Sequence, residues 1–217
     1  MEYKKIFSYN KRIEKTAYMN WRIDSRNQID NMINIADGYK QSTLILTQQC
    51  LENNLDKKAD IIIFPILFNA NHAIELYFKS IMWAINTLLN RNKKYEGKHN
   101  IYQMFTVVKS LILEFEKDKE KYKYFKKITE NLEKYLNELN EQIEFTEGRR
   151  KFDGMDFSRY PFATNNHSHF YVETFDNIVV DLENFLERFK EIFYELENLA
   201  KYYSYLVDEE KDARSYY

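Results

Sequence analysis

The sequence predicts an all-α protein, an up-and-down bundle of four to five long helices. Turn-forming residues are scarce, since the 217 residues include four Gly and two Pro, whereas average usage gives about 26 at this length. Folds with many short strands or with Gly-rich nucleotide-binding turns need more of both. Apolar residues recur at three- and four-residue steps over long stretches, which is typical of helices. Aromatic residues make up 17% of the chain and supply one sizeable core.

The apolar spacing predicts the helices in chain order. A basic, irregular arm of about 20 residues precedes a first helix that starts at Asp24, in which Gly38 is a bend or an end. The second helix starts near Asp60, because Pro65 then falls in its first turns, where proline is tolerated. The remaining helices are expected at residues 100–115, at residues 119–145, and from near His169 to about Leu206. We expect residues 1–59 to form an arm and a helix, and residues 60–217 to form the bundle, as one compact unit.

Charge and cysteine content indicate a cytoplasmic protein. The formal net charge of −2 excludes wholesale binding of polyanions but allows a local basic site. Cys50 is the single cysteine, so it forms no intramolecular disulfide, and we expect it to pack as a small apolar residue. The longest apolar run, residues 61–68, is shorter than the roughly 20 residues of a membrane span. The N-terminus lacks the apolar segment of a signal peptide.

The second helix carries a polar face opposite its apolar stripe. At 100° per residue, four polar residues fall together: His72, Glu75, Lys79 and Asn86. Large apolar residues lie among them, namely Phe68, Leu76, Met82 and Trp83. A helix that is apolar nearly all round is buried on both sides or meets a partner. The polar residues are therefore either a buried hydrogen-bonded network or part of a subunit interface.

The long connection at residues 147–168 is the best place for a functional site. It holds three of the six Gly and Pro residues and is far longer than the usual 2–8 residues between helices. Three consecutive basic residues, Arg149, Arg150 and Lys151, are candidates for binding RNA.

Three sequence segments give the chain a family resemblance. The run FPILFNANHAIELYFK at residues 64–79 resembles the first core helix of HEPN-like proteins. The run GKHNI at residues 97–101 resembles the Gly-His-Asn/Asp-Leu turn that starts their second helix. The run RYPF at residues 159–162 is similar to an Arg-Tyr-Pro element in one branch of that superfamily. The resemblance covers about residues 60–206.

The resemblance implies a dimerising helical bundle with a role in a prokaryotic toxin–antitoxin or phage-defence system. Catalytic members are metal-independent endoribonucleases with an Arg-x(4–6)-His motif whose two copies face each other across the dimer. By this resemblance Arg159 is a phosphate clamp, and His167 or His169 is a general acid or base. Seven and nine residues separate these histidines from Arg159, so the family spacing is not met.

Two functions stay open at this point. The first is RNA cleavage by Arg159 with one of the two histidines, since such cleavage needs a group that titrates near neutrality and a cation on the phosphate. The alternative is a non-catalytic HEPN-like module that binds a protein or nucleotide partner. In a purely structural interpretation, Arg159 pairs with a carboxylate such as Glu75, His167 caps the last helix, and His99 caps or bridges at the start of the third.

No cofactor or metal is expected. No P-loop or dinucleotide-binding glycine pattern occurs in the sequence. His167 and His169 with Glu173 suggest a metal site, but no clustered further ligands follow. The expected partners are a second copy of the chain, RNA, and a cognate antitoxin or another defence protein, with no membrane involved.

Overall fold

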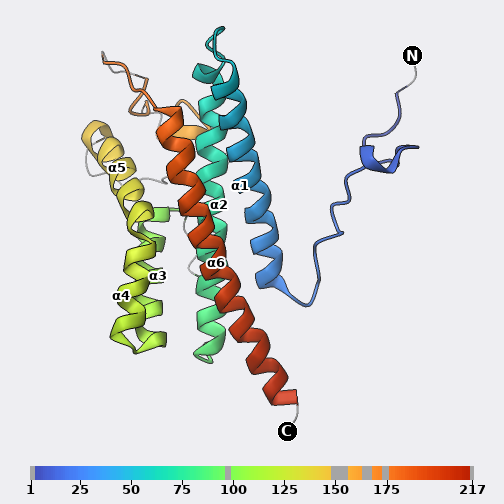
Figure 1. The fold of residues 1–217 in the computed structure, drawn as a ribbon, viewed down its shortest axis with the longest axis vertical. Helices are drawn as coiled ribbons and strands as arrows, with labels where there is room; N and C mark the ends of the chain where they lie inside the picture. Colours follow the sequence, from blue (N-terminus) through green and yellow to red (C-terminus); the bar gives the residue numbers. More distant parts are fainter. Residues whose placement is uncertain (1–2, 96–98, 148–155, 163–167, 173–175, 216–217) are drawn as a thin grey trace.

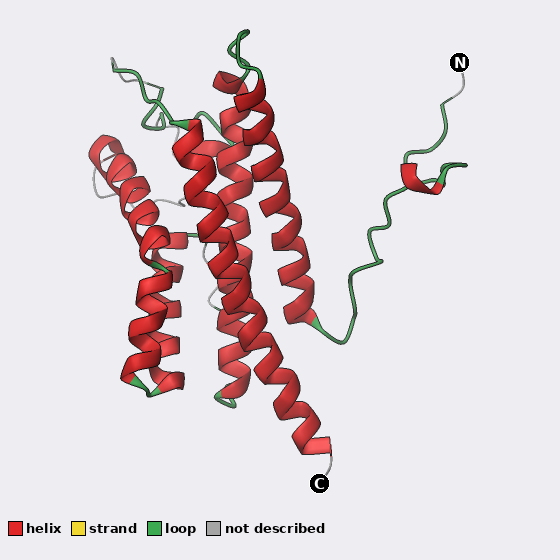
Figure 2. Ribbon diagram, viewed as in Figure 1, coloured by secondary structure: helices red, strands yellow, loops and turns green. Residues whose placement is uncertain are grey.

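The computed structural model confirms the all-α class. It describes residues 3–95, 99–147, 156–162, 168–172 and 176–215. Within these residues there are six α-helices and no strand (Figure 2). The helices are α1 (Gln28–Glu52), α2 (Ala59–Leu88), α3 (Ile101–Glu116), α4 (Lys119–Ile128), α5 (Glu130–Glu147) and α6 (Leu182–Ser215). Two 3-10 turns, η1 (Ile13–Lys15) and η2 (Asp156–Ser158), lie outside them.

Helix α2 is the centre of the bundle. It packs against α1, α6 and α3, and α1 and α6 also contact each other (Figure 1). The apolar stripe predicted from the sequence forms the core, with Ile74, Phe78, Ile81 and Ile85 fully buried. Among the described helices, α2 alone is long and apolar enough to cross a membrane, a test that the buried core helix of a bundle also passes. The buried packing of α2 explains its composition.

Buried polar groups join the three long helices. The ammonium of Lys40 in α1 lies 3.0 Å from the Asp37 carboxylate and 2.7 Å from that of Glu197 in α6. The hydroxyl of Tyr77 in α2 donates to the same Asp37 carboxylate. Burial alone would lower the pKa of Lys40, but its hydrogen bonds to Glu197 and Asp37 outweigh this effect and raise it. These contacts fix α1 on α2 and α6.

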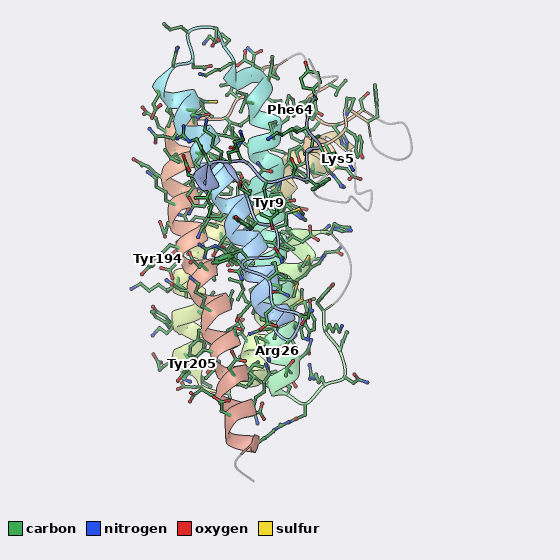
Figure 3. The ribbon with its side chains drawn as sticks, turned by 90° about the vertical axis from the view of Figure 1, so that its right-hand side faces the viewer. Lys5, Tyr9, Arg26, Phe64, Tyr194 and Tyr205 are labelled. Atoms are coloured by element: carbon green, nitrogen blue, oxygen red, sulfur yellow. The ribbon has the colours of Figure 1, made fainter. Side chains whose placement is uncertain are left out.

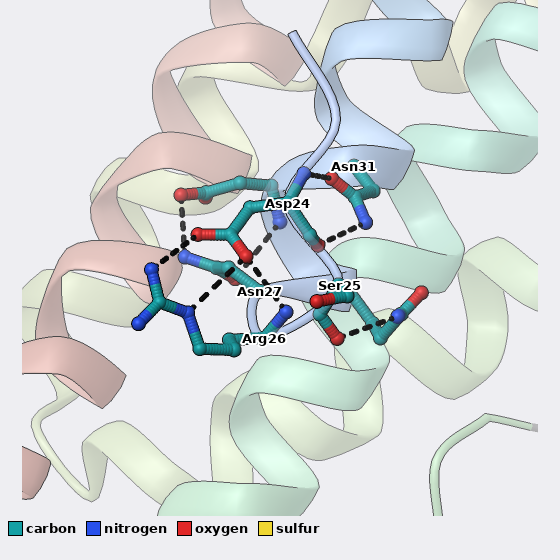
Figure 4. Close-up of polar contacts among 7 residues, drawn as sticks. Asp24, Ser25, Arg26, Asn27 and Asn31 are labelled. Carbon is teal, nitrogen blue, oxygen red and sulfur yellow. Dashed lines mark hydrogen bonds and ion pairs between the residues drawn. The ribbon is translucent and has the colours of Figure 1, made fainter. Parts of the chain in front are cut away.

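Helix α1 begins at Gln28, four residues later than the sequence indicates. The Asn27 side chain caps it by accepting from the backbone N–H of Asp30 at 3.2 Å. Before this cap, Asp24 and Asn31 exchange two hydrogen bonds of 2.8 and 2.7 Å, and the Arg26 N–H donates to the Asp24 carboxylate (Figure 4). The chain therefore forms a hydrogen-bonded turn at residues 24–27. Cys50, at the other end of this helix, is buried as predicted.

Gly38 neither bends nor ends α1, which continues to Glu52. A Cβ added at Gly38 would meet no atom within 4 Å. We expect Gly38→Ala to raise the free energy of unfolding by about 0.5–1 kcal/mol, because alanine restricts the unfolded chain and fits a helix interior. Urea titration measures this change. An unchanged or lowered midpoint would contradict the exposed, strain-free setting of this position.

The single helix predicted at residues 119–145 is two helices, α4 and α5. The break lies at Thr129, whose φ of −98° and ψ of 8° are not helical. Its hydroxyl donates to the carbonyl of Phe125 at 2.8 Å, a local bond that bends helices. The apolar spacing continues across the break, which is why periodicity alone does not detect it.

The last helix begins at Leu182 and not near His169, so this sequence prediction was wrong by 13 residues. The β-branched run of residues 178–180 disfavours helix, because side-chain freedom is lost against the preceding turn. Asp181 then caps the helix, since its carboxylate accepts from the backbone N–H groups of Glu183 and Asn184 at 3.1 Å each.

Candidate functional site

A buried carboxylate with basic neighbours lies on the polar face of α2. The side chain of Glu75 is fully buried. Its Oε1 lies 2.5 Å from the Lys79 ammonium and 2.9 Å from Nδ1 of His99, and its Oε2 lies 3.3 Å from Nδ1 of His72. His72 and Lys79 reach it because they stand three residues before and four after it on the helix. The sequence leaves two alternatives for this polar face, a buried hydrogen-bonded network or a subunit interface. The contacts within the chain form a hydrogen-bonded network.

Glu75 is ionised throughout the neutral range. Burial raises the pKa of this carboxyl, but the hydrogen bonds from His72 and Lys79 and the charges of Lys79 and His99 outweigh burial and lower the pKa to about 2. A buried carboxylate of this kind is stabilised by its paired, hydrogen-bonded neighbours. Glu75 thus acts as the anchor that positions three basic side chains.

Aromatic rings surround the accessible side of this network. His72 stacks on Phe68 at a centroid distance of 5.6 Å and meets the edge of Tyr39 in α1 at 4.5 Å. The Lys79 ammonium lies 5.3 Å from the ring centroid of Tyr95, which follows α2. The aromatic rings pack against His72 and Lys79, and the basic side chains of the network stay partly exposed.

Arg159, which belongs to the connection between α5 and α6, lies beside Phe68 at the edge of this aromatic cluster. Its guanidinium lies 5.8 Å from the centroid of Phe68, the ring that stacks on His72. Its charge partner is Asp156 in the preceding turn η2, and its side chain is 38% exposed. The carboxylate expected from the sequence, Glu75, is not this partner, because its oxygens already receive three other groups. Arg159 is therefore a partly exposed cation beside the α2 network.

A small second core holds this connection in place. Phe157 and Phe170 pack with Ile143 of α5. The Tyr171 hydroxyl donates to the carbonyl oxygens of Phe157 at 2.8 Å and of Tyr160 at 3.2 Å. The described parts of the connection are thus ordered by aromatic packing around η2, and Arg159 has a defined position.

The histidine predicted to pair with Arg159 lies inside the protein. His169 is 1% exposed, and its backbone N–H donates to the carbonyl of Pro161 at 3.2 Å. In this arrangement the imidazole is not open to a large substrate. His167, the alternative histidine, and the predicted RNA-binding residues Arg149, Arg150 and Lys151 lie outside the described residues, as does Glu173.

The sequence leaves the role of His99 open between two possibilities. The expectation that it caps or bridges at the start of α3 is resolved in favour of a bridge, since it binds Glu75. The helix cap is Asn100, whose side chain accepts from the N–H of Gln103 at 2.9 Å. Among the described residues, no three His, Cys, Asp or Glu side chains are grouped so that they could hold a metal ion.

Comparisons with family models, curated proteins and solved structures gave no match to this chain. The similarity to HEPN-like proteins rests on the three sequence segments described above. Two of these segments form the α2 network, with His72, Glu75 and Lys79 from the first and His99 from the second. Arg159 of the third segment lies 5.8 Å from the ring centroid of Phe68, which stacks on His72.

Proposed function

We propose that this chain is a HEPN-like helical module of a prokaryotic toxin or phage-defence system, and that it acts in the cytoplasm as a homodimer. Its role is to bind the phosphate groups of RNA or of a nucleotide at the basic network of α2. The observation that carries this proposal is the meeting of basic side chains from two separate sequence segments at one buried carboxylate, Glu75, with Arg159 of a third segment beside the neighbouring ring of Phe68.

The hydrogen-bond donors of the site favour an anionic ligand. Three basic side chains meet the Glu75 carboxylate, and Arg159, which is paired with Asp156 and 38% exposed, lies nearby beside Phe68. An arginine presents a planar fork of donors that matches phosphate oxygens. His99 is 52% exposed, so one of its ring nitrogens meets Glu75 while the other faces away from it. Phosphate oxygens would accept hydrogen bonds from the N–H groups of these side chains that do not contact Glu75.

RNA binding by Arg159 can be measured directly. We expect a fluorescent single-stranded oligoribonucleotide to bind the wild-type chain in the presence of EDTA, and Arg159→Ala to weaken this binding about tenfold, the effect of losing roughly 1.4 kcal/mol. Arg91→Ala is a matched control, because Arg91 is also a partly exposed arginine in an ion pair, with Glu114. Equal losses in the two variants, or no binding by the wild type, would reject the phosphate site.

RNA cleavage is a second candidate function. The observation that favours it is the Glu75–His99 contact, because a carboxylate that holds one imidazole nitrogen orients the other for proton transfer. An RNA cleavage assay tests this histidine. The same assay tests the catalytic pair expected from the resemblance, Arg159 with His167 or His169. RNA that remains intact at high protein concentration with EDTA would reject cleavage and leave the binding proposal standing.

A further inference from the structure

Four tyrosines on two neighbouring helices remain uncovered in the described structure. They are 42–64% exposed: Tyr124 on α4, and Tyr194, Tyr202 and Tyr205 on α6. Helix α6 crosses in front of α2, with α4 beside it (Figure 1), and Tyr194 and Tyr205 point outward from α6 (Figure 3). Exposed aromatic residues scattered singly are ordinary, but four on adjoining helices form a patch of the kind that meets a partner.

A groove of about 530 Å³ separates α4 from α6, and three of these four tyrosines line it. Two hydrogen bonds fix how the helices lie along it. Asn131, which follows α4, donates to Glu191 at 2.9 Å, and Tyr203 donates to Glu116, which precedes α4, at 3.1 Å. Helix α4 therefore runs antiparallel to residues 191–203 of α6.

The lip of the groove on α6 is acidic. Seven exposed residues follow one another at three- and four-residue steps and share one helix face, namely Glu187, Glu191, Tyr194, Asn198, Tyr202, Tyr205 and Glu209. This face holds three glutamates and no lysine or arginine. Lys190 and Lys201 lie at its edge, and Lys201 is paired with Glu197.

The lip on α4 is basic. The helix carries five lysines against one glutamate, Glu120. Lys121 is paired with Glu116. Lys123 lies 3.8 Å from Glu120, but these two side chains are 75% and 82% exposed, so this ion pair is weak. Lys127, one helical turn after Lys123, is exposed and forms no ion pair with a described residue. The helix thus keeps an excess of positive charge.

Two acids of α6 lie where an additional cation would be stabilising. Glu191 and Glu195 are four residues apart on the helix, and neither forms an ion pair with a described residue. Burial and the negative charge of Glu191 raise the pKa of the Glu195 carboxyl above its ordinary value. Like charges at this spacing destabilise a helix, so a positive charge placed between them would stabilise both.

We propose that the face formed by α4 and α6 in one copy binds the same face of a second copy, about a two-fold axis that runs along the groove. This inference rests on the proposed homodimer and names its contact surface. A half-turn about this axis exchanges the two lips, so that α4 of each copy lies over α6 of the other. A face with one basic and one acidic lip is complementary to itself, as a two-fold contact requires.

The alignment of the two helices places the charges opposite each other. A rotation about an axis along the groove keeps each residue at its own level, and the Asn131 contact puts the end of α4 level with Glu191. Lys127 of one copy then approaches Glu191 and Glu195 of the other. The tyrosines of both copies meet between these charged rows.

The area of this face is enough for a stable dimer. A fully buried aromatic side chain contributes about 200 Å², and the four tyrosines expose 42–64% of theirs. Two copies would therefore bury roughly 900 Å² through their tyrosines alone. The stems of the exposed lysines and glutamates on both lips add to it, which brings the contact to the roughly 1,200 Å² of a specific interface.

Charge reversal tests this arrangement. One variant carries Lys123→Glu and Lys127→Glu on α4, and the other carries Glu191→Lys and Glu195→Lys on α6. Sedimentation should show a wild-type dimer, and each variant alone should dimerise at least tenfold more weakly. An equimolar mixture of the two variants should dimerise again, because every α4 then meets an α6 of opposite charge. A single chain with all four substitutions should dimerise for the same reason.

The controls make the same charge changes away from this face. Lys4→Glu with Lys5→Glu in the arm, and Glu52→Lys with Asp56→Lys at the turn after α1, alter exposed residues and should dimerise as the wild type does. Circular dichroism verifies that every variant is folded.

Three results would overturn the inference. A monomeric wild type would remove the homodimer together with its contact. A wild-type dimer whose reversed variants also dimerise as the wild type does, or whose mixture and fourfold variant stay monomeric, would reject this contact and leave the homodimer standing. RNA binding through Arg159 is measured separately, so the dimer contact and the phosphate site fail independently.

Discussion

Replacing Glu75 with glutamine should lower the free energy of unfolding at pH 7 by about 3 kcal/mol. Glutamine keeps the size and one acceptor oxygen of the side chain but removes the charge that faces Lys79, His72 and His99. Removing one partner of a buried ion pair costs about 3–5 kcal/mol, because the other charge is left without compensation. For a chain of this size we expect the melting temperature to fall by roughly 6–12 °C.

The matched control is Glu52→Gln, which makes the same chemical change at the exposed end of α1. It should change the free energy of unfolding by less than about 0.5 kcal/mol. Thermal and urea unfolding of both variants give the comparison. A Glu75→Gln protein as stable as the wild type would show that the network does not support α2, and the site would lose its structural anchor.

The fold class was predictable because it depends on local periodicity and composition. Helix α2 begins at Ala59, within one residue of the predicted start at Asp60, since its apolar stripe is long and regular. The start of α6 was not predictable in the same way. The aromatic residues after His169 continue a helix-like spacing, but the side chain of Asp181 decides where the helix begins.

The candidate site was predictable only as far as one helix face. The spacing of His72, Glu75 and Lys79 places them together without any tertiary information. The contact of Glu75 with His99, 24 residues later, depends on how the connection between α2 and α3 folds back. For Arg159 the sequence predicts a distant partner, Glu75, but the structure gives a local one. Its ion pair is with Asp156, three residues earlier in the chain.

The stability difference between the wild type and Glu75→Gln should depend on pH in a defined way. The pKa of Glu75 falls from 4.5 to about 2 on folding, so the folded state binds this proton less tightly than the unfolded state does. The carboxylate therefore stabilises the protein fully above pH 4.5, and this stabilisation is lost as the pH falls towards 2. A change of this size corresponds to about 3 kcal/mol.

Urea titrations of both proteins from pH 7 to pH 3 test this dependence. We expect a gap of about 3 kcal/mol at pH 5 that narrows progressively below pH 4.5. Glutamine does not titrate, so subtracting the two curves cancels the contributions of all other carboxylates that the substitution leaves unchanged. A gap that stays constant down to pH 3 would mean that Glu75 keeps its ordinary pKa. The three basic side chains would then not be held by a permanently charged anchor, and the phosphate site proposed on α2 would lose its electrostatic basis.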